Sequence, residues 1–384
     1  MQDWQNGGFG LYLHWPFCQS KCPYCDFNSH VAAKIDQAAW QHAYLSEIDR
    51  IAAETPGRVL NTVFLGGGTP SLMDPALVAA LIERIRARWP VANDLEITLE
   101  ANPGSVEAAR FHDFASAGVN RVSMGVQALN DADLQRLGRL HSTADARRAF
   151  DIARTVFKRV SFDLIYARQH QTLAGWQKEL DDALSMAIDH LSLYQLTIEP
   201  GTAFGARYDK GSLRGLPDDD SAADMYLATQ EICAAHGLPA YEVSNHARDS
   251  AESRHNLIYW RYGDYAGIGP GAHGRLTLDG TRYATTTPLA PQAWLDQVNT
   301  KGTGENPRES IPTEEQAVEY LMMGLRLTSG IDMARYSRLA GQDLPATKIE
   351  TLVDHGLVLT DGATLRATPS GRAVLNGVLR MLLN

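Results

Sequence analysis

Residues 10–25 read GLYLHWPFCQSKCPYC, an apolar run followed by a loop that holds three of the chain's four cysteines. The run GLYLHW is nearly continuous in its apolar character, as expected of a parallel strand that is covered on both faces. Chemically active side chains just past the end of such a strand are typical of α/β proteins. The stretch therefore predicts an α/β fold, and the rest of the chain can be searched for the same pattern.

The pattern of a short apolar strand followed by an amphipathic helix recurs through the first half of the chain. One helix, over residues 74–89, has Asp74 as its predicted N-cap and Pro75 at its first helical position. Six β/α units in series favour a partial TIM-like (β/α)6 barrel. An open doubly wound sheet is the alternative, because strand count does not separate the two topologies. The predicted strands are residues 10–15, 61–67, 95–102, 121–127, 160–166 and 190–197.

Beyond residue 200 the pattern breaks into turns rich in Gly and Pro, which predicts three parts to the chain. Residues 1–240 are the predicted barrel domain, residues 241–311 a connecting segment, and residues 312–384 a smaller C-terminal domain. Helical segments, a hairpin with Asp361-Gly362 at its turn and a final helix make this last domain resemble a winged helix. Its Lys and Arg residues do not outnumber its Asp and Glu residues, so a packing or lid role is expected and DNA binding is not.

Composition excludes several classes of protein. The chain has 384 residues, of which 44% are hydrophobic and 21% charged, as in an ordinary globular protein. Its net charge of -10 is opposite in sign to the charge that neutralises phosphates, so nucleic-acid binding is not expected. No apolar run approaches the ~20 residues that span a bilayer, and the start lacks a secretory pattern. We expect a cytoplasmic protein, with transient docking at a membrane left open.

Three interpretations of the cysteine loop compete. The pair Cys22 and Cys25 in Cys-Pro-Tyr-Cys is typical of a glutaredoxin-like redox site, but that motif begins a helix in a small domain. Structural zinc needs four ligands, and only His14 or His30 lie near enough in sequence to complete the set. With Cys18 the loop offers three thiolates, which on a [4Fe–4S] cluster would leave one iron open to an exogenous ligand.

The spacing C-x-x-x-C-x-x-C directly after the first strand resembles the cluster loop of the radical S-adenosylmethionine superfamily. The motifs GGGTP, EANP, SMGVQ and DLIY at later strand ends are also similar to that family. The resemblance implies a [4Fe–4S] cluster on Cys18, Cys22 and Cys25, with S-adenosylmethionine at the open iron. It also implies a set of residues that contact S-adenosylmethionine, namely Tyr12, Tyr24, Gly67, Gly68, Thr69, Glu100, Gln127, Arg139 and Asp163.

Within the superfamily, the chain resembles oxygen-independent coproporphyrinogen III oxidases and related heme chaperones over nearly its whole length. The oxidase branch has a fourth cysteine two residues after the third, where this chain has Phe27. Residues 255–260, HNLIYW, match the H-N-x-x-Y-W motif of the chaperone branch. A histidine can ligate heme iron, and aromatic side chains can pack on the macrocycle. One departure is Ala167-Arg168-Gln169, which follows DLIY where the family often has Gly-Leu-Pro.

The resemblance to the chaperone branch implies a protein that carries heme as cargo and passes it to acceptor hemoproteins, including respiratory enzymes that can be membrane-bound. His255 is the predicted heme ligand, and His273 in GIGPGAHG is a second candidate. The alternative is an enzyme that decarboxylates porphyrinogen propionates with a radical derived from S-adenosylmethionine. Both functions share the cofactor residues up to Asp163, so no catalytic residue is assigned.

Overall fold

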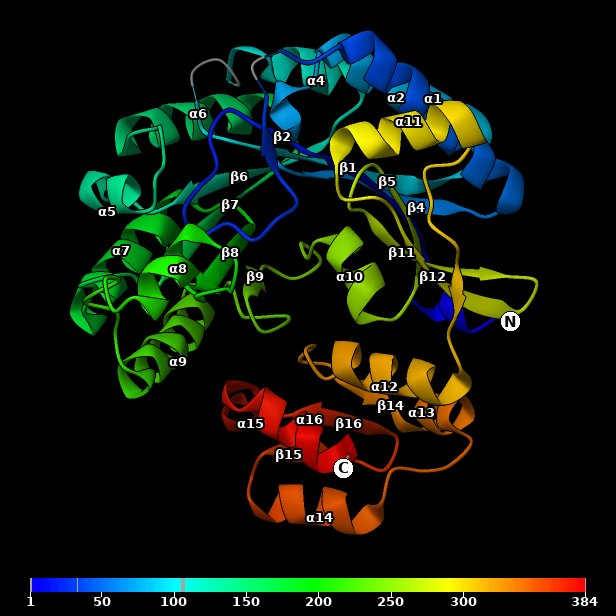
Figure 1. Ribbon diagram of the computed structural model, residues 1–384. Helices are drawn as coiled ribbons and strands as arrows, with labels where there is room; N and C mark the ends of the chain where they lie inside the picture. The colour runs from blue at the N-terminus through cyan, green and yellow to red at the C-terminus, as the bar shows by residue number, and fades with distance from the viewer. Residues whose placement is uncertain (1, 33, 105–107, 384) are drawn as a thin grey trace.

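The computed structural model describes residues 2–32, 34–104 and 108–383 (Figure 1). One 11-stranded sheet forms its centre, in the order β13-β12-β11-β10-β1-β4-β5-β6-β7-β8-β9. The strands are β1 (Phe9–Trp15), β4 (Leu60–Gly67), β5 (Val91–Ala101), β6 (Arg121–Gln127), β7 (Arg159–Tyr166), β8 (His190–Gln195), β9 (Asn245–Ala247), β10 (Asp264–Ile268), β11 (His273–Leu278), β12 (Thr281–Thr286) and β13 (Glu309–Ser310).

The six strands predicted from the sequence are β1, β4, β5, β6, β7 and β8. They are consecutive neighbours and every pair is parallel, which confirms the predicted β/α series. The strand order is linear, with β13 and β9 at its two edges, so the barrel is partial. β10 adds a further parallel strand beside β1, and β11, β12 and β13 continue the sheet in antiparallel pairs.

Helices follow most of these strands and bury their apolar faces on the sheet. α2 begins as predicted, because Asp74 accepts a hydrogen bond from the amide of Ala76 at 2.9 Å and Pro75 holds the first helical position. The helices of this part are α1 (Gln37–Glu54), α2 (Pro75–Arg88), α4 (Phe111–Ala117), α5 (Asp131–Arg136), α6 (Thr143–Val156), α7 (Leu173–Met186), α8 (Ala203–Asp209), α9 (Asp219–Ala235), α10 (Arg254–Trp260) and α11 (Pro291–Lys301).

An aromatic cluster joins the beginning of the chain to the segment beyond residue 290. The rings of Trp40 on α1 and Trp294 on α11 stack at 5.5 Å with an interplanar angle of 7°. Tyr44 packs on Trp294, and Trp15 of β1 packs on Trp40. α11 therefore lies along α1 over the sheet, as Figure 1 shows, so residues 241–311 contribute strands and a covering helix to the main body. The three-part division of the chain stays a prediction.

The C-terminal elements form a second apolar core below the sheet in Figure 1. Two contacts join this core to the main body. Tyr262, from the turn after α10, packs into the core, and Arg335 Nη2 forms an ion pair with Asp3 Oδ2 at 2.7 Å. No helix among the described residues is long and apolar enough to cross a membrane. The elements are α12 (Thr313–Gly324), β14 (Ile331–Asp332), α13 (Met333–Ala340), α14 (Ala346–Asp354), β15 (Val358–Thr360), β16 (Thr364–Ala367), α15 (Pro369–Ala373) and α16 (Leu375–Leu383).

The cap of α2 gives a direct test of the helix boundary. Asp74→Ala removes the acceptor for the Ala76 amide and should lower the free energy of unfolding by about 1 kcal/mol. Asp74→Asn keeps an acceptor oxygen and should retain most of that stability. Equilibrium urea unfolding followed by circular dichroism measures both variants. Equal losses in the two would show that the cap is not what Asp74 contributes.

Candidate functional site

A cavity of about 140 Å³ lies where the carboxyl ends of β4, β5, β6 and β7 meet the cysteine loop after β1. The structure brings most of the predicted cofactor residues to this one cavity. Tyr12 is the exception, because it lines a neighbouring cavity instead. The predicted residues that line the first cavity are Cys18, Cys22, Tyr24, Cys25, Gly67, Gly68, Thr69, Glu100, Gln127, Arg139 and Asp163.

The three cysteines of the loop are free and half-buried. Burial raises the pKa of the Cys18 and Cys25 thiols above the ordinary value, and the Cys25 thiol lies 3.9 Å from the hydroxyl of Ser29. Within the described residues, no three His, Cys, Asp or Glu side chains converge closely enough to hold a single metal ion. The loop instead presents three separate thiols to one cavity, an arrangement that fits the ligand set of a multi-iron cluster.

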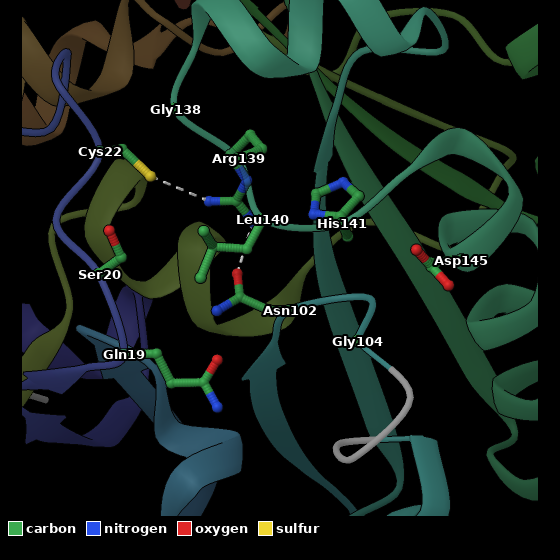
Figure 2. Close-up of a pocket in the computed structure, with 10 residues that line it drawn as sticks. All are labelled: Gln19, Ser20, Cys22, Asn102, Gly104, Gly138, Arg139, Leu140, His141 and Asp145. Carbon is green, nitrogen blue, oxygen red and sulfur yellow. Dashed lines mark hydrogen bonds between the residues drawn. The ribbon is translucent and has the colours of Figure 1, made fainter.

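A chain of hydrogen bonds connects Cys22 to Cys18 across the cavity. Its first two bonds are drawn in Figure 2, where Arg139 donates from Nη1 to the Cys22 sulfur at 3.4 Å and from Nη2 to Asn102 Oδ1 at 2.5 Å. Asn102 Nδ2 donates to Thr69 Oγ1 at 3.1 Å, and Thr69 Oγ1 donates to the Cys18 sulfur at 3.5 Å. The chain thus directs donors at two thiols, and donors of this kind stabilise thiolates and tune the centre that thiolates bind.

Asn102 is not among the residues predicted from the sequence, although it lies within the EANP motif. Its side chain is the central link of this chain and lines the cavity. A strand-end asparagine after a glutamate carries no spacing signal of its own, because asparagine is also frequent in turns and caps. The only available clue was its position at the end of a strand whose neighbours all carry polar side chains at the same edge.

Gly67, the last residue of β4, and Gly68, which follows it, line the cavity. Gly67 has φ +111°, and a Cβ atom there would lie 2.7 Å from Cε1 of His14. A Cβ atom on Gly68 would lie 2.7 Å from the carbonyl oxygen of Phe17. No other residue type fits either position without displacing β1 or its loop. Close packing against β1 and its loop therefore requires glycine at both positions, and both residues line the cavity.

Two carboxyl groups, those of Glu100 and Asp163, line the cavity. Burial, with the charge of Asp163, raises the pKa of Glu100 to about 8, while Glu100 accepts a hydrogen bond from the Gly67 amide at 3.1 Å. Burial raises the pKa of Asp163 to about 6, an effect opposed by hydrogen bonds from Ser192 and Ser123 and by the charge of Arg121. A ligand with amino or hydroxyl donors would supply the compensation that both ionised carboxylates lack.

Gln127 lies at the end of β6 in a left-handed conformation, with φ 73°. Its side chain folds back over β6, where a Cβ atom on Gly125 would lie 2.9 Å from Gln127 Nε2. A non-glycine residue in this region of φ costs free energy and persists where its surroundings hold it, often at functional sites.

The Ala167-Arg168-Gln169 loop, where the sequence departs from the family pattern, has a structural explanation. Arg168 is buried and paired with Asp133 at 2.9 Å and with Glu179 at 2.5 Å, so this loop is structural.

A second cavity, of about 690 Å³, adjoins the first. Phe27, Gly67 and Glu100 line both cavities, so these residues form a shared wall. The second cavity is rich in aromatic side chains, and its aromatic lining residues are Tyr12, Phe27, Phe64, Tyr259, Trp260, Tyr262 and Tyr265.

His255, the predicted heme ligand, lines this second cavity but is engaged on both ring nitrogens. Its Nδ1 lies 2.7 Å from Thr62 Oγ1 and its Nε2 lies 2.6 Å from the Tyr259 hydroxyl. The ring is 1% exposed, and burial lowers its pKa to about 3. It is therefore a neutral imidazole at ordinary pH, and either nitrogen must give up a hydrogen bond before it can bind a metal.

The comparisons with known proteins agree with this geometry. A model described as the Radical SAM superfamily matches residues 12–183, and one described as the HemN C-terminal domain matches residues 311–374. The chain is 36% identical to "Heme chaperone HemW" of Escherichia coli (strain K12) over 378 residues, with 97% of each chain covered. It is 39% identical to "Radical S-adenosyl methionine domain-containing protein 1, mitochondrial" of Bos taurus, covering 97% of this chain and 87% of the relative.

A solved structure, the coproporphyrinogen III oxidase HemN from Escherichia coli, has a TM-score of 0.81 to this chain at 22% identity. The likeness covers 98% of this chain and 92% of that one. It establishes the fold and the partial barrel with its C-terminal helical domain.

Because the pKa of Glu100 is raised, we predict that Glu100 lowers the free energy of unfolding of the ligand-free protein as pH rises. Between pH 4.5, the ordinary pKa, and about 8, the folded state holds a proton that the unfolded chain releases, so its stability falls as pH rises. Glu100→Gln cannot ionise, and its advantage in free energy of unfolding over the parent should grow across that window. Urea unfolding at several pH values measures it, with the exposed Glu350→Gln as control. A constant difference across the window would contradict the burial argument.

Proposed function

We propose, from the premise that the chain belongs to the HemW family within the radical S-adenosylmethionine superfamily, that it is a chaperone that binds heme and delivers it to acceptor hemoproteins. The observation that carries the proposal is the aromatic cavity of about 690 Å³ beside the cysteine cavity. Cavities of this size and apolar character are those that bind cofactor-sized ligands. A porphyrin is a flat apolar ring with charged propionates at one edge.

The lining of the larger cavity suits both parts of a porphyrin. Tyr259 and Tyr265 pack edge to face at 4.5 Å between ring centroids, which supplies rigid aromatic surface for a macrocycle. Arg275 lies on the same lining, paired with Glu319 at 2.7 Å, and both side chains are about one-quarter exposed. Arginine recognises carboxylates through its planar fork of donors. We infer that Arg275 exchanges Glu319 for a heme propionate.

The family implies a [4Fe–4S] cluster and S-adenosylmethionine, and we propose that Cys18, Cys22 and Cys25 hold the cluster. When bound and reduced, such a cluster would be able to supply an electron to the sulfonium of S-adenosylmethionine. Arg139 and Thr69 would donate hydrogen bonds to the Cys22 and Cys18 thiolates. The remaining proposed contacts to S-adenosylmethionine are Tyr12, Tyr24, Gly67, Gly68, Glu100, Gln127 and Asp163.

The acceptors that we propose are hemoproteins such as respiratory enzymes, including membrane-bound ones. The proposed location is the cytoplasm, with transient association at a membrane. Against the oxidase alternative stands Phe27, which occupies the position of the oxidase's additional cysteine. The likeness to the oxidase structure, at 22% identity, concerns the fold alone.

Heme titration of the purified protein tests the proposal. We expect a saturable Soret band, and Trp260→Ala should weaken heme binding roughly tenfold, because an aromatic wall of the cavity is lost. Tyr208→Ala, at a tyrosine 57% exposed outside the cavity, is the matched control. Absence of saturable binding would reject the chaperone function.

The enzyme alternative is tested separately. Anaerobically reconstituted protein, given coproporphyrinogen III and S-adenosylmethionine, should form no protoporphyrinogen. Appreciable turnover, measured by chromatography of the porphyrins, would favour the oxidase function instead.

The cluster assignment makes its own prediction. Cys22→Ala should abolish the iron–sulfur absorbance at about 400 nm after anaerobic reconstitution, whereas Cys233→Ala, at the cysteine buried in α9, should not. Asn102→Ala breaks the hydrogen-bond chain between two thiols and should speed the loss of iron to a chelator on the order of tenfold. Iron and sulfide analysis checks these results, and full iron content in Cys22→Ala would refute the ligand set.

A further inference from the structure

We propose that His273, the first residue of β11, ligates heme iron, and that His255 is a fixed part of the cavity wall. The inference rests on the proposed heme-binding function and assigns the iron ligand within the same cavity. It departs from the expectation that the histidine of the HNLIYW segment binds the metal. Three histidines line the larger cavity, namely His14, His255 and His273.

Two of these histidines have no free ring nitrogen. His14 is 5% exposed, and its Nδ1 lies 3.0 Å from the Tyr12 hydroxyl while its Nε2 lies 2.9 Å from the Asn28 carbonyl oxygen. His255 is held in the same way by Thr62 and Tyr259. Ligation by either ring would leave a buried hydroxyl or carbonyl without its hydrogen-bond partner, which is unfavourable. These rings are fixed parts of the cavity wall.

His273 differs in both respects. Its side chain is exposed, and among the described residues its ring makes no hydrogen bond that must be broken. An imidazole binds iron through an unshared nitrogen lone pair, and this ring can present one without cost. Of the three histidines, His273 is therefore the one whose chemistry is uncommitted.

The backbone of His273 is nevertheless held firmly. His273 pairs with Thr286 of β12, and β10 passes so close that a Cβ atom on Gly267 would lie 2.1 Å from the His273 carbonyl oxygen. Asn28 donates from Nδ2 to the carbonyl oxygens of Pro270 and Leu289, both at 2.9 Å, and so fixes the turn before β11. A free ring on a fixed backbone is the arrangement that preorganises a ligand.

The surroundings of His273 suit a cargo that must leave. Phe27 is 61% exposed and Leu289 is 64% exposed, and both line this cavity. Exposed apolar side chains beside a cavity provide surface that the edge of a porphyrin would cover. A chaperone has to surrender the iron to the acceptor's own ligand. A ligand on an exposed side chain can be exchanged there, whereas one sealed within the core cannot.

Spectroscopy of the heme complex tests the assignment. His273→Ala should weaken ferric heme binding at least roughly tenfold and remove the imidazole signature from the Soret and electron paramagnetic resonance spectra. Added imidazole should restore that signature in His273→Gly, a result that a merely structural role would not give. His236→Ala, at an exposed histidine outside the cavity, is the matched control and should behave as the parent.

The rival ligand is tested without emptying the core. Tyr259→Phe and His255→Gln alter the hydrogen bonds of the buried ring, and both variants should keep the imidazole signature of the parent. Retention of the signature in His273→Ala, or its loss in His255→Gln while folding is intact by circular dichroism, would overturn the assignment. If the parent itself shows no saturable heme binding, the proposed function fails instead, so the two failures are distinguishable.

Discussion

Parallel pairing of β1, β4, β5, β6 and β7 brings the ends of five strands to one edge of the sheet, and the site depends on this alignment. Each strand delivers a different chemical group there: a thiol loop, bare backbone, a carboxyl and an amide, a strained glutamine and a second carboxyl. None of these groups is close to the others in sequence. The strand register therefore brings these groups together, as the sequence of a single loop does for a local binding motif. A slip of one residue in the register would turn every group to the opposite face.

The hydrogen-bond chain through Arg139 and Asn102 adds electrostatic order to that alignment. The positive charge of Arg139 lies beside Cys22. Asn102 accepts a hydrogen bond from Arg139 and donates one to Thr69, whose hydroxyl donates to Cys18. A thiolate ligand without such donors would carry its charge in a partly buried setting, where desolvation is costly. Two of the three thiols thus receive hydrogen bonds from residues that follow strands other than β1.

The strands, the cap of α2 and the cysteine cavity could be predicted from the sequence, because each leaves a local signal. Apolar runs mark the strands, and Asp74-Pro75 marks a helix start. The sheet extension by β10 to β13 could not be predicted, because pairing between β1 and β10 joins residues about 250 positions apart. The position of Tyr12 on the larger cavity could not be predicted for a related reason. Successive strand residues point to opposite faces, and periodicity alone does not say which face meets which cavity.

His255 is a single residue that shows the same limit of prediction from sequence. Its motif predicted a heme ligand, but its partner Thr62 lies 193 residues away in the chain. Whether a histidine is a free ligand or a committed hydrogen-bonder depends on such partners, and they are visible only in the folded chain.

The wall that Phe27, Gly67 and Glu100 form between the two cavities has a thermodynamic consequence. Molecules on its two sides would contact opposite surfaces of the same three residues, so a shift of the wall by one molecule would change what the other contacts. Linkage then requires that any change in affinity be mutual, by one factor in both directions. Coupling between occupancy of the two cavities would therefore be carried by these three residues.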